Sequence, residues 1–311
     1  QAGRYLPEFR KIRKINQDFI ELCLNEKLSA EITLQPLKRF NLDAAIIFSD
    51  ILMIPYGLGQ KVMFSKGFGP KLEKLKLEKI KKTKPEDFIG NLKPIYKSLK
   101  KISKNKILKD KDLIGFVGAP WTLLVYMINQ QSPKKKLNES FFKNKHEFKE
   151  IFKVIEFYSK IHILNQIKNG ATIIQIFDSW AGLVEKKDLE EFVYVPNRNI
   201  VDYVKSMGVP VICFPKGIKD YKTFVDKVEP DVLSIDYEVK PREISKNISI
   251  PIQGGFNPNV LLTNTDEIKK EALKYINIFK DHPYIFNLGH GVLPQTDPNM
   301  VEYLVNFVKN N

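Results

Sequence analysis

The chain has 311 residues, of which 43% are hydrophobic and 11% aromatic, so a large folded core is expected and global disorder is excluded. No stretch approaches about 18 uncharged apolar residues, and the first residues contain no apolar signal-peptide core, which argues against a membrane span or secretion. The two cysteines, Cys23 and Cys213, are far apart, which argues against a disulfide framework and favours the cytoplasm.

The formal net charge of +14 comes from one region of the chain. Residues 61–160 contain 25 lysines, no arginine and 10 acidic residues, whereas the remaining residues sum to a charge of −1. Because arginines and a known nucleic-acid motif are missing there, lysine-covered helix faces are favoured over RNA binding, and no nucleic-acid partner is expected. A field of this sign would still help to capture a polyanionic ligand.

Arginines gather at the beginning of the chain. Arg4, Arg10 and Arg13 lie within the first 13 residues, although the whole chain has only six arginines. A guanidinium group binds a carboxylate or phosphate through a planar two-point fork, which lysine cannot reproduce. This cluster therefore predicts an anion-binding segment, and three unrelated surface arginines are the alternative.

Short apolar runs then alternate with segments of helical periodicity along the chain. The runs are rich in β-branched and aromatic residues, as in strands buried on both faces. They predict seven strands, at 44–49, 113–118, 171–177, 210–214, 231–235, 250–253 and 284–288. The clearest helical patterns lie between or after them, at about 148–162, 188–207, 265–280 and 299–310.

This order predicts an α/β fold in which parallel strands are joined by right-handed helical crossovers. Seven strands are one short of a closed barrel. We therefore expect a single-domain (β/α)₈ TIM barrel over residues 1–311, slightly irregular, whose first strand precedes residue 1. Residues 57–111 are expected to form a long lysine-rich insertion between the first two visible strands.

In such a barrel, chemistry belongs at the carboxyl ends of the strands and in the loops that follow them. Asp50 follows the first visible strand and precedes another apolar run, where an unpaired carboxylate would be costly to bury. It is either a helix cap or ion-pair partner, or a carboxylate that faces N–H donors or a developing cation. His290 lies between two glycines, so it is either a structural histidine or one that a ligand approaches closely.

Other forms of catalysis find little support in the sequence. Ser179 follows the strand at 171–177, but the GxSxG nucleophile motif is absent, so a hydrogen-bonding role is favoured. No HExxH, HxC or CxxC motif is present, so we expect no metal site. GxGxxG and P-loop patterns are also missing, which removes the usual signals for dinucleotide or nucleotide binding.

Several blocks of sequence together resemble the uroporphyrinogen decarboxylase family. They occur in the family's order and span essentially the whole chain. The blocks are QAGRYLPEFR at the start of the chain, Thr33–Leu52, GFVGAPWTLLVYMI at Gly115–Ile128, IQIFDSWAG at Ile174–Gly182, FPKG at Phe214–Gly217, and IFNLGHGVLPQTDP at Ile285–Pro298.

This resemblance implies a cytoplasmic enzyme of haem and porphyrin biosynthesis on a (β/α)₈ barrel. It implies a lyase that removes the four acetate carboxyls of uroporphyrinogen III as CO₂ to give coproporphyrinogen III. The pyrrole ring is protonated and acts as the electron sink, so no metal or organic cofactor is implied. The expected partners are a tetrapyrrole polyanion and a second copy of the chain in a homodimer, without a membrane.

The resemblance also implies roles for particular residues. Asp50 would hydrogen-bond the pyrrole N–H groups, and Arg4 would bind substrate carboxylates and take part in proton transfer. The further expected substrate contacts share the pocket or the N-terminal loop, and Lys216 is a weaker candidate beside them. These contacts are Phe9, Arg13, Tyr126, Ser179 and His290.

Two alternatives come from other classes of protein. A cobalamin or coenzyme-M methyltransferase of the same superfamily would need a zinc site with a His-x-Cys pair and a later cysteine. Here Gly291 and Val292 follow His290, and no cysteine lies beyond Cys213. A basic RNA-binding protein would use the lysine-rich region at 61–160, and its affinity would fall steeply with salt.

Overall fold

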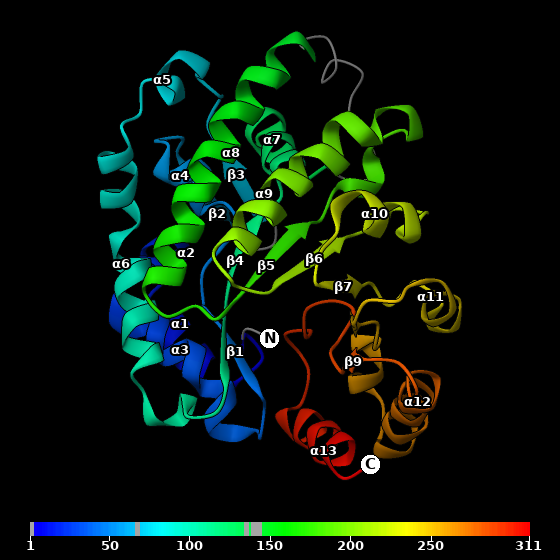
Figure 1. Cartoon of the computed structure of the whole chain (residues 1–311). Helices are drawn as coiled ribbons and strands as arrows, with labels where there is room; N and C mark the ends of the chain where they lie inside the picture. The colour runs from blue at the N-terminus through cyan, green and yellow to red at the C-terminus, as the bar shows by residue number, and fades with distance from the viewer. Residues whose placement is uncertain (1–2, 66–68, 134–136, 138–144) are drawn as a thin grey trace.

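The computed structural model describes residues 3–65, 69–133, 137 and 145–311, and its centre is a curled parallel sheet (Figure 1). The seven strands of this sheet lie in the order β1-β4-β5-β6-β7-β8-β9, and each pair of neighbours is parallel. Their bounds are β1 (Ala44–Ile46), β4 (Asp112–Gly118), β5 (Ile173–Asp178), β6 (Val211–Pro215), β7 (Val232–Ile235), β8 (Ile252–Gly254) and β9 (Tyr284–Ile285).

All seven strands predicted from apolar runs are confirmed in position and order. The strongest runs give the longest strands, β4 and β5, which pair from Ile114↔Ile173 to Gly118↔Phe177. The first and last strands are shorter than predicted, because residues 47–49 and 286–288 continue them without a regular ladder. Only Ile47 N–H to the Ile114 carbonyl and the bridge Phe256↔Leu288 extend the pairing there.

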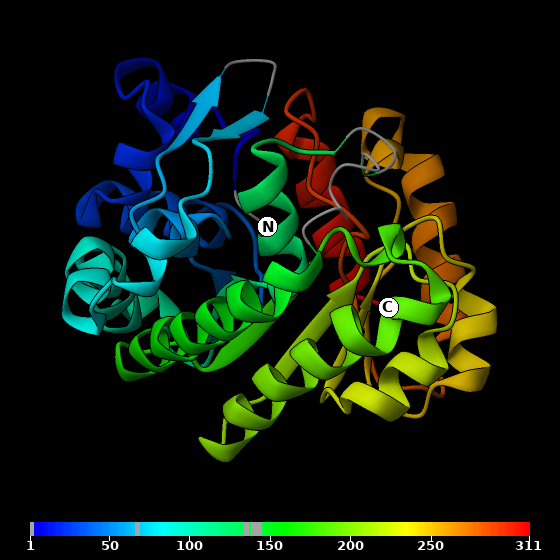
Figure 2. The ribbon, with the colours of Figure 1, turned by 90° about the horizontal axis from the view of Figure 1, so that it is seen from above.

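Helices cover the outer face of the sheet, as the two views at right angles show (Figure 1, Figure 2). Helix α3 (Glu26–Arg39) contacts β1, α8 (Lys145–Lys168) contacts β4, and α9 (Val195–Ser206) contacts β6. The other helices are α1 (Pro7–Ile15), α2 (Phe19–Cys23), α4 (Met53–Gly57), α5 (Leu77–Lys81), α6 (Pro85–Ser103), α7 (Pro120–Asn129), α10 (Tyr221–Val228), α11 (Pro241–Asn247), α12 (Thr265–Ile278) and α13 (Pro298–Lys309). Within the described ranges, no helix is long and apolar enough to cross a membrane.

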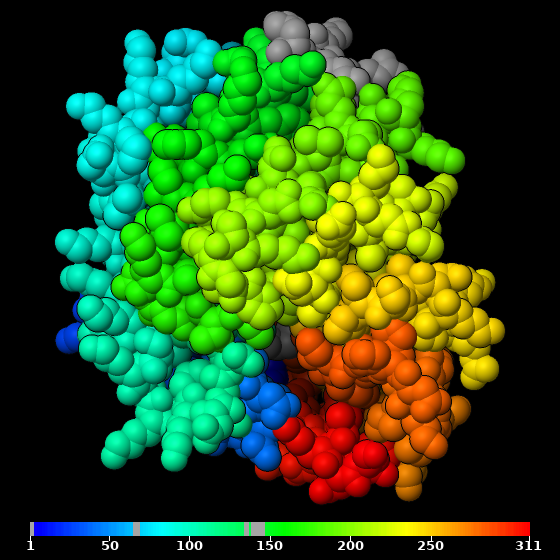
Figure 3. Space-filling view, in the orientation of Figure 1, coloured from blue at the N-terminus to red at the C-terminus, as the bar shows by residue number. Residues whose placement is uncertain are grey.

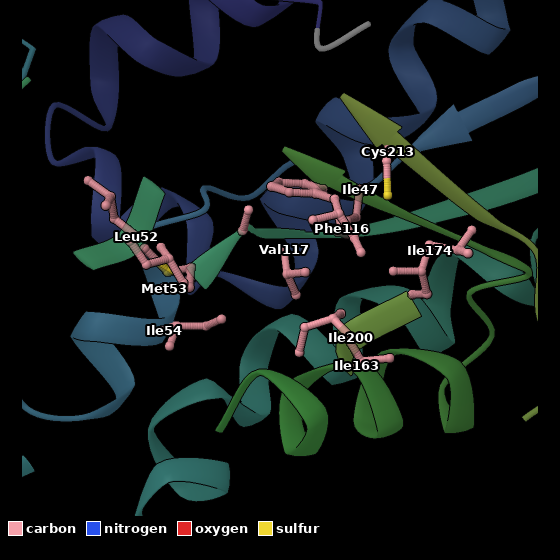
Figure 4. Close-up of a cluster of buried hydrophobic side chains, with 14 of the residues drawn as sticks. Ile47, Leu52, Met53, Ile54, Phe116, Val117, Ile163, Ile174, Ile200 and Cys213 are labelled. Atoms are coloured by element: carbon pink, nitrogen blue, oxygen red, sulfur yellow. The ribbon is translucent and has the colours of Figure 1, made fainter. Parts of the chain in front are cut away.

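The core lies between the sheet and these helices. Figure 4 shows Val117 of β4 and Ile174 of β5 above Ile163 of α8 and Ile200 of α9. Each of these four side chains is almost completely buried. A fully buried aliphatic side chain contributes about 1.5–3 kcal/mol, so this layer fixes β4 and β5, and with them the loops at their carboxyl ends.

The segment between β1 and β4 contains more regular structure than an insertion in a loop. After α4 comes an antiparallel hairpin of β2 (Val62–Ser65) and β3 (Gly69–Leu72), followed by α5 and the long α6, which packs against α3 and α8. The hairpin was not predicted from the sequence. Residues 66–68, 134–136 and 138–144 of the lysine-rich region lie outside the described residues.

The sheet does not close between its first and last strands, because β1 and β9 are not paired with each other among the described residues. A cavity of about 560 Å³ lies along this open edge. Its lining combines Ile46 of β1, Ile285 of β9 and Leu304 of α13 with side chains from inside the sheet, such as Ile173. Figure 3 shows the surface hollowed where the blue N-terminal segment faces the orange and red C-terminal segments.

Candidate active site at the carboxyl end of the sheet

Asp50 lies just beyond the carboxyl end of β1 and is half-buried. Its Oδ1 accepts a hydrogen bond of 2.9 Å from the Leu52 N–H, so the carboxylate caps the turn that leads into α4. The hydrogen bond found for this carboxylate within the described part of the chain is the one to Oδ1. Burial raises the pKa of Asp50, while the Leu52 N–H and the charge of Arg4 oppose that rise. Asp50 therefore caps the turn with Oδ1, and its Oδ2 can accept a hydrogen bond from another group.

Two of the clustered arginines converge on one aromatic ring. The Cζ atoms of Arg4 and Arg13 lie 5.1 and 5.9 Å from the ring centroid of Phe19, which begins α2. Arg13 also donates from Nη1 to the carbonyls of Asn16, at 2.6 Å, and Gln17. Cation–π contacts of this kind hold a guanidinium in place without neutralising its charge. Both guanidinium groups therefore keep a charge that can attract an anion, and their contact with substrate stays a prediction.

Arg10, the third arginine of the cluster, points elsewhere. Its Nη2 donates to the Pro294 carbonyl and so joins α1 to the loop that follows β9. Phe9, predicted to line the cleft, is 6% exposed and packs against Phe48, with 5.8 Å between the ring centroids. Phe48 also packs edge-on against Phe19, so Phe9 supports the ring that carries the two arginines. Direct contact of Phe9 with substrate stays a prediction.

Tyr126 projects from α7, next to the carboxyl end of β5. Its hydroxyl accepts a hydrogen bond of 3.4 Å from Ser132 Oγ, and its ring lies 6.0 Å from that of Trp180 in an edge-on arrangement. Burial raises the pKa of Tyr126, and the charge of Asp50 raises it further. Tyr126 and Asp50 therefore lie close enough to interact, with the phenol in its neutral, proton-donating form.

Trp180, two residues after β5, was not predicted as a site residue. Its main chain is fixed on both sides, because its N–H donates to Thr122 Oγ1 at 3.1 Å and its carbonyl accepts from Trp121 Nε1 at 2.9 Å. Its own indole Nε1 is buried without a hydrogen bond in the described part of the chain. Ser179, which precedes it, is half-buried at the same strand end. Its contact with substrate stays a prediction.

Asp178, the last residue of β5, is buried and connects this strand to α7 and α9. Its two oxygens accept hydrogen bonds from Thr122 Oγ1 of α7, at 2.7 Å, and Asn197 Nδ2 of α9, at 2.9 Å. Burial raises the pKa of Asp178 to about 6, although both hydrogen bonds favour the charged form. This network fixes the start of α7, and therefore Tyr126, relative to the end of β5.

A second group of charged residues lies at the ends of β6, β7 and β9. Lys216 Nζ is 3.5 Å from Asp236 Oδ2, and the Asp236 side chain is 3% exposed. His290 follows β9 and is largely exposed; partial desolvation of its ring and the charge of Lys216 lower its pKa, while Asp236 and Glu238 oppose this change. His290 thus lies near Lys216, and Arg4 and Tyr126 lie near Asp50.

No metal centre is found in the described ranges, where no group of three or more His, Cys, Asp or Glu side chains could hold an ion. Cys23 and Cys213 are both free and buried. Burial raises the pKa of each thiol, which disfavours the thiolate that a metal would bind.

The chain matches the family model described as uroporphyrinogen decarboxylase over residues 1–311. It is 40% identical over 316 residues to the uroporphyrinogen decarboxylase of Rickettsia bellii, covering 99% of this chain and 92% of that protein. The enzyme of the same name from Rickettsia felis is 39% identical, with 99% and 91% covered. The chain belongs to the uroporphyrinogen decarboxylase family. It is therefore a carboxy-lyase of porphyrin biosynthesis, as the sequence blocks predicted.

A solved structure, a methyltransferase from Methanosarcina mazei, resembles the fold with a TM-score of 0.77 at 16% identity, covering 96% of this chain and 90% of that one. At this identity the likeness concerns the fold alone. The family match therefore decides between the two predicted enzyme classes, and it favours the decarboxylase over the methyltransferase.

Proposed function

We propose that the chain removes the four acetate carboxyls of uroporphyrinogen III as CO₂ and produces coproporphyrinogen III, without a metal or an organic cofactor. The family match over the whole chain supports this reaction. The observation that carries the proposal is the position of Asp50, a half-buried carboxylate at a strand end, close enough to Arg4 for the arginine's charge to affect its pKa. A carboxylate beside fixed cations suits a substrate that combines N–H donors with many carboxylates.

The substrate itself provides the electron sink for this reaction. Protonation of a ring carbon makes one pyrrole cationic, and the bond between the acetate methylene and its carboxyl carbon then breaks. The released electron pair neutralises the ring, CO₂ leaves, and the methylene takes up a proton to become a methyl group. The ring carbon finally returns its proton, so each cycle exchanges one CO₂ for one proton.

This chemistry requires a group that stabilises the cationic ring and groups that bind the substrate carboxylates, and the residues of the site suit both requirements. Oδ2 of Asp50 accepts the pyrrole N–H groups and stabilises the cationic ring, which is where charge develops. Arg4 binds substrate carboxylates and takes part in proton transfer, and Arg13 adds a second guanidinium. Tyr126 donates its hydroxyl proton to a carboxylate beside them. Ser179 and His290 are expected to bind further carboxylates on the substrate, and Phe9 supports the aromatic base.

We propose that the open edge of the sheet receives an eighth parallel strand, which closes a single-domain (β/α)₈ barrel. Two observations support this: β1 and β9 leave their outer edges unpaired in the described chain, and the cavity between them is lined mainly by aliphatic side chains. Unpaired strand edges are costly unless they are covered. The chain is also proposed to act as a homodimer in the cytoplasm, without a nucleic-acid partner.

Chelation of metal ions tests the cofactor part of the proposal. Under anaerobic conditions, excess EDTA is expected to leave CO₂ release from uroporphyrinogen III unchanged within about twofold, because the substrate ring performs the electronic role of a cofactor. A parallel reaction with added Zn²⁺ is expected to show no stimulation. Loss of most of the activity in EDTA, with recovery on adding metal, would revive a metal-dependent mechanism.

Replacement of Arg13 by lysine tests whether the guanidinium fork matters. Lysine keeps the positive charge but cannot donate to two carbonyls and an anion in one plane. We expect R13K to raise KM about tenfold, which corresponds to about 1.4 kcal/mol of binding, with kcat changed less than threefold.

The control for R13K is R39K, because Arg39 makes an exposed ion pair with Glu8. Exposed pairs contribute little, so R39K is expected to keep wild-type kinetics. Wild-type KM in R13K would show that only charge is needed at this position.

A further inference from the structure

Lys216 and Asp236 form an ion pair in which the two side chains differ strongly in solvent exposure. Asp236 follows β7 and its side chain is 3% exposed, whereas Lys216 follows β6 and is 34% exposed. The Nζ–Oδ2 distance is 3.5 Å, and Oδ2 accepts no hydrogen bond in the described part of the chain. The other oxygen, Oδ1, accepts only from the Glu238 N–H, at 3.2 Å. A buried carboxylate thus faces an ammonium group that is open to solvent.

An ion pair with this geometry contributes little to the stability of the fold. Burying a carboxylate is unfavourable unless close, well-directed hydrogen bonds offset the loss of its hydration. An ammonium group has three donors. Lys216 Nζ donates no hydrogen bond within the described residues, and its one ion pair is long. The donors of Lys216 therefore remain available for a second anion on the exposed side.

The main chain around Lys216 is, by contrast, held firmly against the end of β5. Its N–H donates to the Asp178 carbonyl at 3.0 Å, and its carbonyl accepts from the Gly182 N–H at 2.9 Å. A Cβ at Gly182 would lie 2.5 Å from the Gly217 carbonyl oxygen, so glycine is required for this approach. Lys216 is thereby placed beside the loop that carries Ser179.

His290 completes the surroundings of the ammonium group. The charge of Lys216 acts on its imidazole, as do the opposing charges of Asp236 and Glu238. A neutral imidazole can donate one hydrogen bond to a carboxylate, and an adjacent ammonium adds the charge that such a bond lacks. The two residues come from different strand ends, β6 and β9, and could contact the same anion.

We propose that Lys216 binds a carboxylate of the tetrapyrrole substrate, on the part of the sheet edge separated from Asp50 by β4 and β5. Asp236 is a positioning residue that holds the ammonium group in place from its buried side. This inference rests on the proposed function, because it assumes a polycarboxylate substrate. It gives that substrate a cationic contact at the end of β6, in addition to Arg4 and Arg13 of the N-terminal segment.

The test compares K216M with K205M. Lys205 forms an ion pair of similar length with Asp231, at 3.4 Å. Asp231 precedes β7, so this pair lies at the opposite, amino end of that strand. We expect K216M to raise KM at least tenfold with kcat changed less than threefold, and K205M to change neither. K216R, which restores the charge, is expected to recover most of the affinity. The D236N variant is expected to raise KM less than K216M, because the ammonium remains but is less firmly held.

Binding of coproporphyrin III, a stable tetracarboxylate, provides a readout that does not require turnover. Its fluorescence titration is expected to give a Kd at least fivefold weaker for K216M than for wild type, with K205M unchanged. Equal Kd and KM values in K216M and wild type would overturn the proposal, as would a K216R variant as impaired as K216M. Wild-type protein that binds the probe but releases no CO₂ would instead contradict the proposed function.

Discussion

Replacement of Asp50 by alanine is expected to lower kcat about a thousandfold while leaving the protein folded. The carboxylate is the acidic group that the structure places at the carboxyl end of β1, half-buried and near Arg4. Removing one preorganised group that stabilises developing charge typically costs 10²–10³ in rate. The expected effect is at the upper end of this range, because in the proposed mechanism Asp50 also orients the macrocycle by accepting hydrogen bonds from the pyrrole N–H groups.

The effect of D50A on folding is expected to be small. The variant loses the cap on the Leu52 N–H, which contributes about 1 kcal/mol. Asp43 provides a matched control at the other end of β1, where its exposed carboxylate pairs with Lys309. We expect D43A to retain full activity. Activity of D50A within tenfold of wild type, measured on folded protein, would remove Asp50 from the mechanism.

Replacement of Asp178 by alanine is expected to cost about 2–4 kcal/mol of the free energy of unfolding at pH 5, measured by urea denaturation. The variant leaves the buried Thr122 hydroxyl without its acceptor, and leaves Asn197 Nδ2 with the Val193 carbonyl alone. It also loosens α7 from β5, so Tyr126 is less firmly placed. The control is D202A on α9, where the carboxylate is exposed and pairs with Arg198, and its expected change is below about 0.5 kcal/mol.

The pH dependence of the same variant has a definite sign. Burial raises the pKa of Asp178 from 3.8 to about 6, so the folded state favours the protonated form. The resulting stability is fully present below about pH 4 and is lost as the pH rises through 6, in total on the order of 3 kcal/mol. The stability difference between wild type and D178A should therefore narrow between pH 4 and pH 7. A difference that stays constant or widens would show that Asp178 is ionised throughout.

The parallel sheet could be predicted from sequence because its strands are buried on both faces and read as unbroken apolar runs. The hairpin of β2 and β3 could not, because Val62–Ser65 is short and lies among lysines, and its partner strand contains Gly69 and Pro70. Short strands outside the main sheet depend on pairing partners that a local pattern does not reveal.

The positions of candidate site residues could be predicted from the sequence, because active sites in this architecture lie at the carboxyl ends of the strands. Asp50, Ser179 and His290 each follow a strand and could be selected on that ground. The partners of these groups could not be predicted, because they come from distant segments. Thr122 reaches Asp178 across 56 residues of chain, and the buried indole N–H of Trp180 is recognisable only once its surroundings are known.

Anaerobic incubation of the purified full-length protein with uroporphyrinogen III, without added metal or cofactor, tests the account most directly. The products are oxidised to porphyrins and separated by their number of carboxyl groups. We predict compounds with seven, six, five and finally four carboxyls, in step with CO₂ release. If folded protein leaves only the eight-carboxyl compound, the proposed reaction is contradicted.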